Sequence, residues 1–249
     1  SSGLEVQITE LDITTNNFST QAALYKEIFQ LAVNNADKIT AVTLWGTNDS
    51  ISWRSNRNPL LFSAGYAPKE AYYAVMEVAK ASNNNNNNDG DNSGEETLKN
   101  LFKNKFKIGT SVSPHEFNVG SDFIKKHFNS ITPENELKPD SIINQQACQS
   151  QGNNVNTQVR FNSGTQTTLK FCEDNGIPLR GHTFVWYSQT PDWFFKENFN
   201  SGGNYVSKDI MDQRLESFIK NTFDLLARSY PKLEVYAYDV ANELFLNDG

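Results

Sequence analysis

The sequence predicts an α/β fold built from parallel βα units. Strand-like segments alternate with helix-like segments along most of the 249 residues, and hydrophobic residues make up 37% of the chain, enough for a sizeable core. Six candidate strands can be counted, two before an asparagine-rich segment and four after it. A closed (β/α)₈ barrel needs eight, so the chain is two strands short of that architecture.

The part before the asparagine-rich segment reads strand, helix, strand, helix. Apolar and polar residues alternate over residues 4–8, which is the period of a half-buried strand. Residues 20–35 carry an apolar stripe at helical spacing, and residues 39–45 form a second strand. A second helix covers residues 68–80, with Pro68 near its first turn.

Residues 81–94 interrupt this pattern. They contain six consecutive asparagines and then a run of Asp, Gly, Asn and Ser with no large apolar side chain to bury. Such a composition predicts a solvated, flexible linker. It divides the chain into residues 1–80 and 95–249.

The part after the linker repeats the alternation. Gly176 is expected to follow the C-terminus of the third helix of this part, where a left-handed backbone suits glycine. The expected elements, in order, are helix 95–104, strand 106–112, helix 121–128, strand 130–132, helix 165–175, strand 178–186, helix 208–229 and strand 235–242.

Charge and hydropathy exclude several classes of partner. The net charge of −7 and a pI near 5.0, with no basic stripe, argue against nucleic acid. The chain has no apolar run of 18 residues, so no membrane span is expected, and residues 1–20 lack the features of a signal peptide.

The two cysteines, Cys148 and Cys172, are compatible with one disulfide or with two buried thiols. Neither a CxxC motif nor a Cys/His cluster occurs, so no structural zinc is expected. No cofactor is predicted.

Two glutamates stand at the ends of apolar strands. Glu10 shares strand parity with Val6 and Ile8, and Glu243 shares it with Val235 and Ala241. Two carboxylates at the C-terminal ends of barrel strands are what glycoside hydrolysis requires. The pattern alone favours the simpler interpretation, two surface residues at strand ends.

Several motifs around these glutamates resemble family 10 glycoside hydrolases, the (β/α)₈ endo-β-1,4-xylanases. Residues 8–12 resemble the nucleophile strand of that family, and residues 239–243 resemble its acid/base strand. The other matching stretches resemble the second strand with its sugar-binding motif, the third strand, and the eighth strand with the last helix; they are residues 132–140, 181–186, 43–46, 52–54, 59–62 and 71–75.

The resemblance implies a role for each matching residue. Glu10 would attack the anomeric carbon, and Glu243 would protonate the leaving oxygen and later deprotonate water, in retaining chemistry with the carboxyl groups about 5–5.5 Å apart. The remaining residues would contact the sugars: Asn242, Glu134, Asn135, Lys138, His182 and Trp186 on the glycone side, and Trp45 and Trp53 as aromatic walls.

The order of the motifs is reversed relative to the family. Residues 1–80 resemble the C-terminal part of the barrel, with strands seven and eight, and residues 95–249 resemble the N-terminal part, with strands one to four. Strands five and six have no counterpart here. Three arrangements are open: a junction of two tandem family 10 domains, a circular permutant, or a piece of a longer enzyme.

The predicted function is therefore retaining endo-hydrolysis of xylan or xylo-oligosaccharides by a secreted enzyme, linked to further family 10 or carbohydrate-binding modules. One alternative is a non-catalytic carbohydrate-binding fragment, or a tandem junction without a complete active site. Another is a family 10 enzyme with a shifted glycan preference, because Tyr187 stands where the family usually has a histidine. The missing strands leave the activity of this chain by itself open.

Overall fold

The strands and helices of the chain fall into two groups in a computed structural model, which describes residues 3–84 and 95–244. Unit 1 comprises residues Ser1–Thr132 and unit 2 comprises residues Pro133–Gly249. The described residues form six parallel strands that alternate with helices. This confirms the predicted α/β class, an incomplete fold of the (β/α)₈ type.

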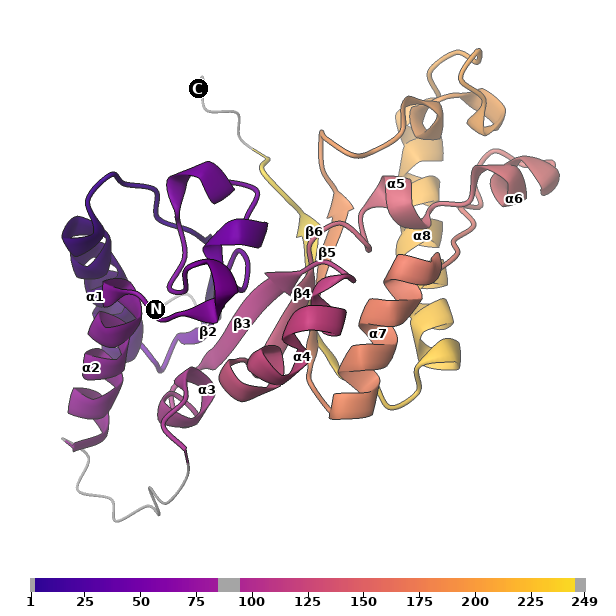
Figure 1. Ribbon diagram of the computed structural model, residues 1–249. Coiled ribbons are helices and arrows are strands. Elements are labelled where there is room, and N and C mark those ends of the chain that lie inside the picture. Colours follow the sequence, from indigo (N-terminus) through magenta and orange to yellow (C-terminus); the bar gives the residue numbers. More distant parts are fainter. Residues whose placement is uncertain (1–2, 85–94, 245–249) are drawn as a thin grey trace. The chain divides into compact units, whose positions relative to one another are not determined.

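Unit 1 contains four strands in sequence order, β1-β2-β3-β4. Helices α1 and α2 pack side by side, as the indigo and purple ribbons of Figure 1 show. The elements are β1 (Val6–Leu11), α1 (Phe18–Asn34), β2 (Ile39–Leu44), the 3₁₀ turns η1 (Asp49–Ile51), η2 (Ser55–Arg57) and η3 (Ala64–Tyr66), α2 (Glu70–Asn84), α3 (Leu98–Leu101), β3 (Lys107–Val112), α4 (Glu116–His127) and β4 (Ser130–Pro133).

A strand from before the linker pairs with a strand from after it. β2 and β3 are parallel neighbours, with Ala41 opposite Lys107 and Leu44 opposite Thr110. Unit 1 therefore contains residues from both sides of the linker. Of the predicted linker, residues 81–84 form the last turn of α2 and residues 85–94 lie outside the described residues.

Aromatic side chains from both sides of the linker build the core of unit 1. The ring centroid of Phe29 in α1 lies 5.3 Å from that of Phe102, and Phe102 stacks on Phe106 at 5.0 Å. Phe29 and Phe102 are fully buried. Such aromatic pairs stabilise a core beyond the area that they bury.

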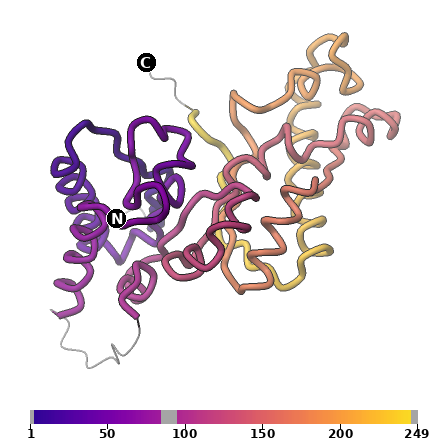
Figure 2. The backbone as a smooth tube through the Cα atoms, in the orientation of Figure 1, coloured from indigo at the N-terminus to yellow at the C-terminus, as the bar shows by residue number. Residues whose placement is uncertain are grey.

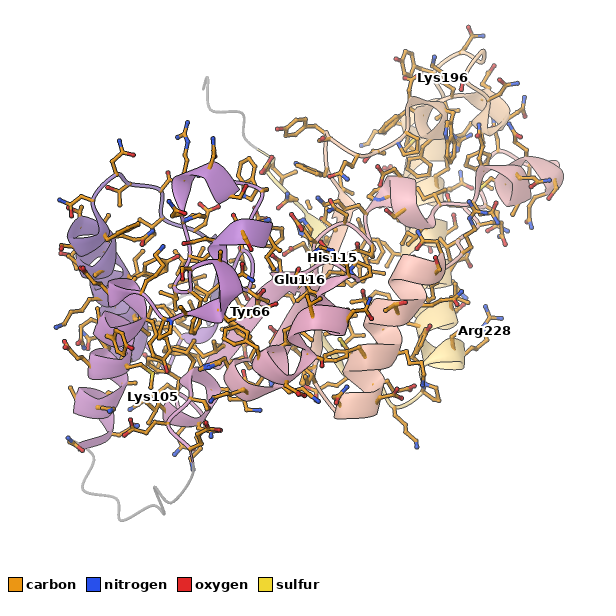
Figure 3. The ribbon with its side chains drawn as sticks, in the orientation of Figure 1. Tyr66, Lys105, His115, Glu116, Lys196 and Arg228 are labelled. Atoms are coloured by element: carbon orange, nitrogen blue, oxygen red, sulfur yellow. The ribbon has the colours of Figure 1, made fainter. Side chains whose placement is uncertain are left out.

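Two helices of unit 1 differ from the predicted bounds. α3 runs only from Leu98 to Leu101, and its start is fixed by Thr97, whose hydroxyl accepts from the Asn100 backbone amide at 3.4 Å. α4 begins at Glu116, five residues earlier than expected. The Glu116 carboxylate accepts the Ser113 amide at 2.8 Å and the Thr47 hydroxyl at 2.7 Å, so it closes the first turn of α4. Figure 3 labels Glu116 at this end of the helix.

Unit 2 contains a parallel pair of strands flanked by long helices. β5 and β6 pair with Leu179 opposite Val235 and His182 opposite Asp239. The chain makes a long excursion between β5 and α8, which can be followed in Figure 2. The elements are α5 (Pro139–Ile142), α6 (Gln145–Ser150), α7 (Ser163–Asn175), β5 (Leu179–Val185), η4 (Asp192–Phe195), η5 (Glu197–Phe199), α8 (Lys208–Ser229) and β6 (Val235–Ala241).

The β5–β6 pair is packed by stacked rings. Tyr238 stacks on Phe184 with centroids 3.9 Å apart, and Phe184 meets Phe218 of α8 edge-on at 5.2 Å. Gly181 lies under the Tyr238 ring, where a side chain would collide with it. α7 ends at Gly176, whose φ of 59° is left-handed, as predicted.

Both cysteines are free and buried, so the two-thiol alternative is the one observed. Burial raises the pKa of Cys148, and it raises the pKa of Cys172 to about 12. Over the described parts of the chain, no helix is both long and apolar enough to cross a membrane.

Candidate active site

Glu243 lies just beyond the C-terminal end of β6. The Asn242 amide donates to the Val185 carbonyl at 2.8 Å, which ties the end of β6 to the end of β5. Glu243 has a left-handed φ of 48°, and Trp186 Nε1 donates to its Oε2 at 2.8 Å. The backbone turn and the indole together orient the Glu243 carboxylate.

Tyr187 is the second aromatic residue beside this carboxylate. Its ring meets that of Trp186 in a T-shaped contact at 5.7 Å, and the residue is 70% exposed. The negative charge of Glu243 raises the pKa of the Tyr187 phenol, and a hydrogen bond between the two side chains adds to this effect.

A lysine–amide cluster contacts the ring of Trp186. Lys138 is 5% exposed, and its Nζ donates to Asn135 Oδ1 at 3.0 Å and to Gln189 Oε1 at 2.7 Å. The same ammonium stands 4.6 Å from the centroid of the Trp186 ring, a cation–π geometry. This cluster holds a positive charge and an indole face beside Glu243.

Two further carboxylates flank Asn135. Glu134 and Glu136 are half-buried, and Glu136 Oε2 accepts from the Asn135 amide at 3.1 Å. Burial raises the pKa of Glu136, and the nearby Glu134 carboxylate acts in the same direction. These residues give the segment after β4 several oxygen acceptors for hydroxyl groups.

His182 is held by a carboxylate from the neighbouring strand. Its ring is almost completely buried, and Nδ1 lies 2.9 Å from Asp239 Oδ2. Arg180 donates to the same carboxylate through two nitrogens, one of them at 2.6 Å from Oδ2. Burial alone would raise the pKa of Asp239, but the His182 hydrogen bond and the Arg180 charge outweigh it and lower the pKa.

Glu10 occupies the corresponding strand end in unit 1. The register of β1 against β2 shifts between Ile8 and Leu11, and Glu10 within this irregularity has a left-handed φ of 54°. A bulge of this kind re-aims a side chain at the end of a strand. Glu10 is half-buried.

The residue two positions further along anchors an exposed tryptophan. Asp12 accepts from Trp53 Nε1 at 3.0 Å and from the Arg54 guanidinium at 3.2 Å. Arg54 also stacks over the Trp53 ring at 4.2 Å. Trp53 remains 62% exposed, whereas Trp45 is only 7% exposed and packs in the core of unit 1.

The structure therefore brings several predicted residues together within unit 2. Contacts join Asn135 to Lys138, Lys138 to the Trp186 ring, and Trp186 to Glu243. The His182 ring centroid lies 6.5 Å from that of Trp186. Glu10, Trp45 and Trp53 belong to unit 1.

Several participants were not among the predicted site residues. Asp12 and Asp239 lie inside the matching motifs, and Asp239 shares strand parity with Glu243, so a signal for these two was present. Arg180 and Gln189 had none, because their roles depend on partners more than 50 residues away.

Within the described residues, no group of three or more His, Cys, Asp or Glu side chains could hold a metal ion.

Comparison with known proteins identifies the family. The model of glycosyl hydrolase family 10 matches residues 1–78 and 97–249, which leaves out only the region of the linker.

Individual relatives are xylanases. The chain is 71% identical over 154 residues to the bifunctional endo-1,4-beta-xylanase XylA of Ruminococcus flavefaciens, covering 62% of this chain and 16% of that protein. It is 48% identical over 153 residues to endo-1,4-beta-xylanase Y of Acetivibrio thermocellus, covering 61% of this chain and 14% of the relative. The chain thus spans about a sixth or less of the length of these relatives.

A solved structure agrees with the sequence relatives. The CBM22-1–GH10 modules of the N-terminal endo-1,4-beta-D-xylanase 10B of Clostridium thermocellum, complexed with xylohexaose, superpose with a TM-score of 0.58 at 44% identity. The match covers 65% of this chain and 31% of that one. With its two matched blocks and the strand-end glutamates in place, the chain belongs to glycosyl hydrolase family 10.

Proposed function

We propose that this chain forms part of a retaining endo-β-1,4-xylanase in which Glu243 is the acid/base and Glu10 is the nucleophile. The observation that carries the proposal is the hydrogen bond from Trp186 Nε1 to Glu243 Oε2, at 2.8 Å, beside a buried lysine that lies over the same indole. This arrangement aims one carboxylate from a strand end toward groups that can bind sugar hydroxyls. Family membership and xylanase relatives support the substrate class.

In the proposed reaction Glu10 attacks the anomeric carbon while Glu243 transfers its proton to the leaving glycosidic oxygen. Glu243 then takes a proton from water, which attacks the glycosyl–Glu10 ester and releases the sugar with retained configuration. The left-handed backbone at both glutamates supports this assignment, because such strain is concentrated at functional sites.

The other residues bind and position the sugars. We assign Lys138, Asn135 and Glu134 to hydroxyls of the glycone side, and Asn242 to the hydroxyl next to the reacting carbon. His182, held by Asp239, shapes the site around the reacting sugar. The exposed Trp53 and the largely buried Trp45 are assigned to the aromatic walls for the sugar rings.

Sugar release from soluble xylan tests the proposal. We expect release by the unmodified chain, and a loss of at least about 10²-fold in E10Q and in E243Q, since each removes a catalytic carboxylate. E5Q and E234Q are matched controls, because Glu5 and Glu234 lie near the other ends of β1 and β6. Binding of xylan without turnover would instead identify a non-catalytic carbohydrate-binding protein, and faster release from a β-1,4-glucan would identify a shifted glycan preference.

Retention and the role of Glu10 need a separate measurement. A 2-fluoro-xylobioside with a good leaving group should glycosylate the nucleophile as that leaving group departs, and peptide mass spectrometry should locate the sugar label on Glu10. Proton NMR of the first product should show the β-anomer. Label on another residue, or an initial α-anomer, would contradict the assignment.

We also infer that the chain is one rearranged family 10 module and not the junction of two. The parallel pairing of β2 with β3, on either side of the linker, supports a single module, because strands of separate domains would not share this register. Mixing E10Q with E243Q chains tests it. A single module should stay inactive in the mixture, whereas restored turnover would mean that two chains supply one carboxylate each.

The polymeric substrate and the linkage of a relative's catalytic module to a CBM22 module support two further proposals. The enzyme acts outside the cell, and it is linked to further family 10 or carbohydrate-binding modules. Detection of the parent protein in culture supernatant, and its mass, test both; a cell-associated protein of the size of one module would contradict them.

A further inference from the structure

A hollow of about 380 Å³ lies on unit 2, and none of the residues assigned to catalysis lines it. Its walls come from the segment before α7, from the first turn of α7 and from the C-terminal end of α8. The volume is at the small end of the range for ligand pockets, about 300–1,000 Å³. We propose that this hollow is a second glycan-binding site that takes a neutral sugar residue of the substrate chain.

The polar groups that line the hollow have hydrogen-bonding capacity to spare. Four of the chain's six arginines donate to oxygen partners through their side chains, but among the described residues Arg160 has no side-chain partner. The hydroxyls of Ser229 and Tyr230 also have none in the described structure. Gln166 donates its amide to the Phe161 carbonyl at 2.7 Å, which leaves its own carbonyl as an acceptor. A guanidinium, two hydroxyls and an amide carbonyl suit a ligand rich in hydroxyl groups.

The apolar part of the lining complements the faces of a sugar ring. Phe161 is 9% exposed and its ring centroid lies 6.3 Å from that of Tyr230, and Leu225 of α8 adds an aliphatic surface. A pyranose presents C–H groups on its faces and hydroxyls at its edge. The hollow offers the same division, with aromatic and aliphatic carbon next to polar edges.

The walls are held in place by main-chain bonds. The Arg160 amide donates to the Ile142 carbonyl at 2.9 Å, and the Asn144 amide donates to the Gln158 carbonyl at 2.9 Å. On the other wall, the Tyr230 amide donates to the Leu226 carbonyl at 2.8 Å and closes α8. A site with a preorganised backbone loses less entropy when it binds a ligand.

The charges around the hollow favour a neutral ligand over an acidic one. Burial raises the pKa of Tyr230, the Glu173 carboxylate raises it further and Lys170 opposes this. Glu173 and the negative end of the α8 dipole therefore offset part of the positive charge that Arg160 and Lys170 bring to the hollow. The carboxylate of an acidic sugar would be attracted by Arg160 but repelled by Glu173 and by the C-terminal end of α8. A neutral sugar does not meet this repulsion.

Because the proposed substrate is a polymer, one glycan chain can occupy the active site and the second site together. A second contact on the same glycan chain raises the effective concentration of the substrate at the active site, without any new contact there. The identity of the glycan as xylan rests on the proposed function. The hollow itself is defined by unit 2 alone.

Xylohexaose titration of the inactive E10Q/E243Q chain, followed by NMR, tests the inference. We expect saturable shifts of the Arg160 Nε–H and of the Ser229 amide. R160A should weaken binding at the hollow roughly tenfold or more, and Y230F should weaken it less. R228A is the matched control, because Arg228 carries the same charge as Arg160 and lies in the last turn of α8, beside Ser229, but does not line the hollow; Figure 3 labels it there.

The outcomes separate this inference from the proposed function. Shifts at the Trp186 indole with none at the hollow would overturn the second site and leave the active-site assignment intact. Shifts at the hollow with none at Trp186 would support the second site and contradict the active-site assignment. Shifts at the hollow with glucuronic acid but not with xylohexaose, or an equal loss in R228A, would overturn the neutral-sugar assignment.

Discussion

Trp186 Nε1 donates a hydrogen bond to Glu243 Oε2 at 2.8 Å, across 57 residues of sequence. The bond joins the residue after β5 to the second residue after β6. It is formed because the two strands are parallel neighbours, so that their C-terminal ends meet at one edge of the pair. The same indole lies under the Lys138 ammonium, so one side chain positions both a carboxylate and a cation.

The Trp186 hydrogen bond should matter most when the leaving group needs a proton. W186F removes the donor and keeps an aromatic ring, so we expect turnover of xylan to fall roughly ten- to hundredfold, part of the ~10²–10⁴-fold that general acid catalysis supplies. The 2,4-dinitrophenolate of a 2,4-dinitrophenyl xylobioside leaves without protonation, so the rate of glycosyl-enzyme formation from this substrate should change much less. W193F is the control. An equal loss with both substrates would show that Trp186 acts in binding alone.

The Tyr187 phenol reports on the charge of its neighbour. Because the Glu243 carboxylate disfavours the phenolate, the pKa of Tyr187 is raised. In E243Q that charge is gone, so the pKa of Tyr187 should move down toward the ordinary value for tyrosine, about 10. Tyrosine ¹³Cζ shifts followed against pH measure this, with Y187F for assignment. An unchanged pKa in E243Q would contradict the contact between the two side chains.

The Arg180–Asp239–His182 cluster should contribute to stability. D239N removes the negative charge and leaves the buried Arg180 without its counter-ion, which typically costs about 3–5 kcal/mol. Urea unfolding should show this loss, whereas D224N, which breaks the exposed Lys220–Asp224 pair on α8, should cost about 1 kcal/mol or less. Equal losses in the two variants would contradict a special role for the cluster.

The same cluster predicts a pH dependence with a defined sign. The pKa of Asp239 is lower in the folded chain than in the unfolded chain. Its stabilising contribution is therefore complete above the unfolded value, about 3.9, and is lost as the pH falls through the folded value. The free energy of unfolding of the unmodified chain should thus fall more steeply than that of D239N below about pH 4.

The two buried thiols should be unreactive in the folded chain. With a pKa of about 12, Cys172 exposes almost no thiolate at pH 8, and Cys148 is also buried with a raised pKa. A thiol reagent should label neither residue until denaturant is added, and then label both. C148S and C172S assign the two signals. Rapid labelling of the native chain, or a disulfide in the non-reduced protein, would contradict this result.

Local patterns predicted the backbone well where each element buries one regular face. The bounds of α8, Lys208–Ser229, agree with the expected helix, because its apolar stripe is long and Pro231 stops it. α4 begins earlier than the pattern indicates, since its first turn depends on a carboxylate bonded to Thr47, 69 residues away. The other bond of this carboxylate is local, because it accepts the amide of Ser113, three residues earlier, so only the Thr47 contact lay beyond the reach of the local pattern.

The sequence by itself determined the alternation of strands and helices, the family, and the two glutamates at strand ends. These depend on periodicity and on short motifs, which are local properties. The tertiary structure decided that β2 pairs with β3 across the linker, that both cysteines stay reduced, and that Trp186, Lys138 and Asp239 hold the site residues. Strand pairing and side-chain networks join residues far apart in the chain, so their geometry exists only once the strands are in register.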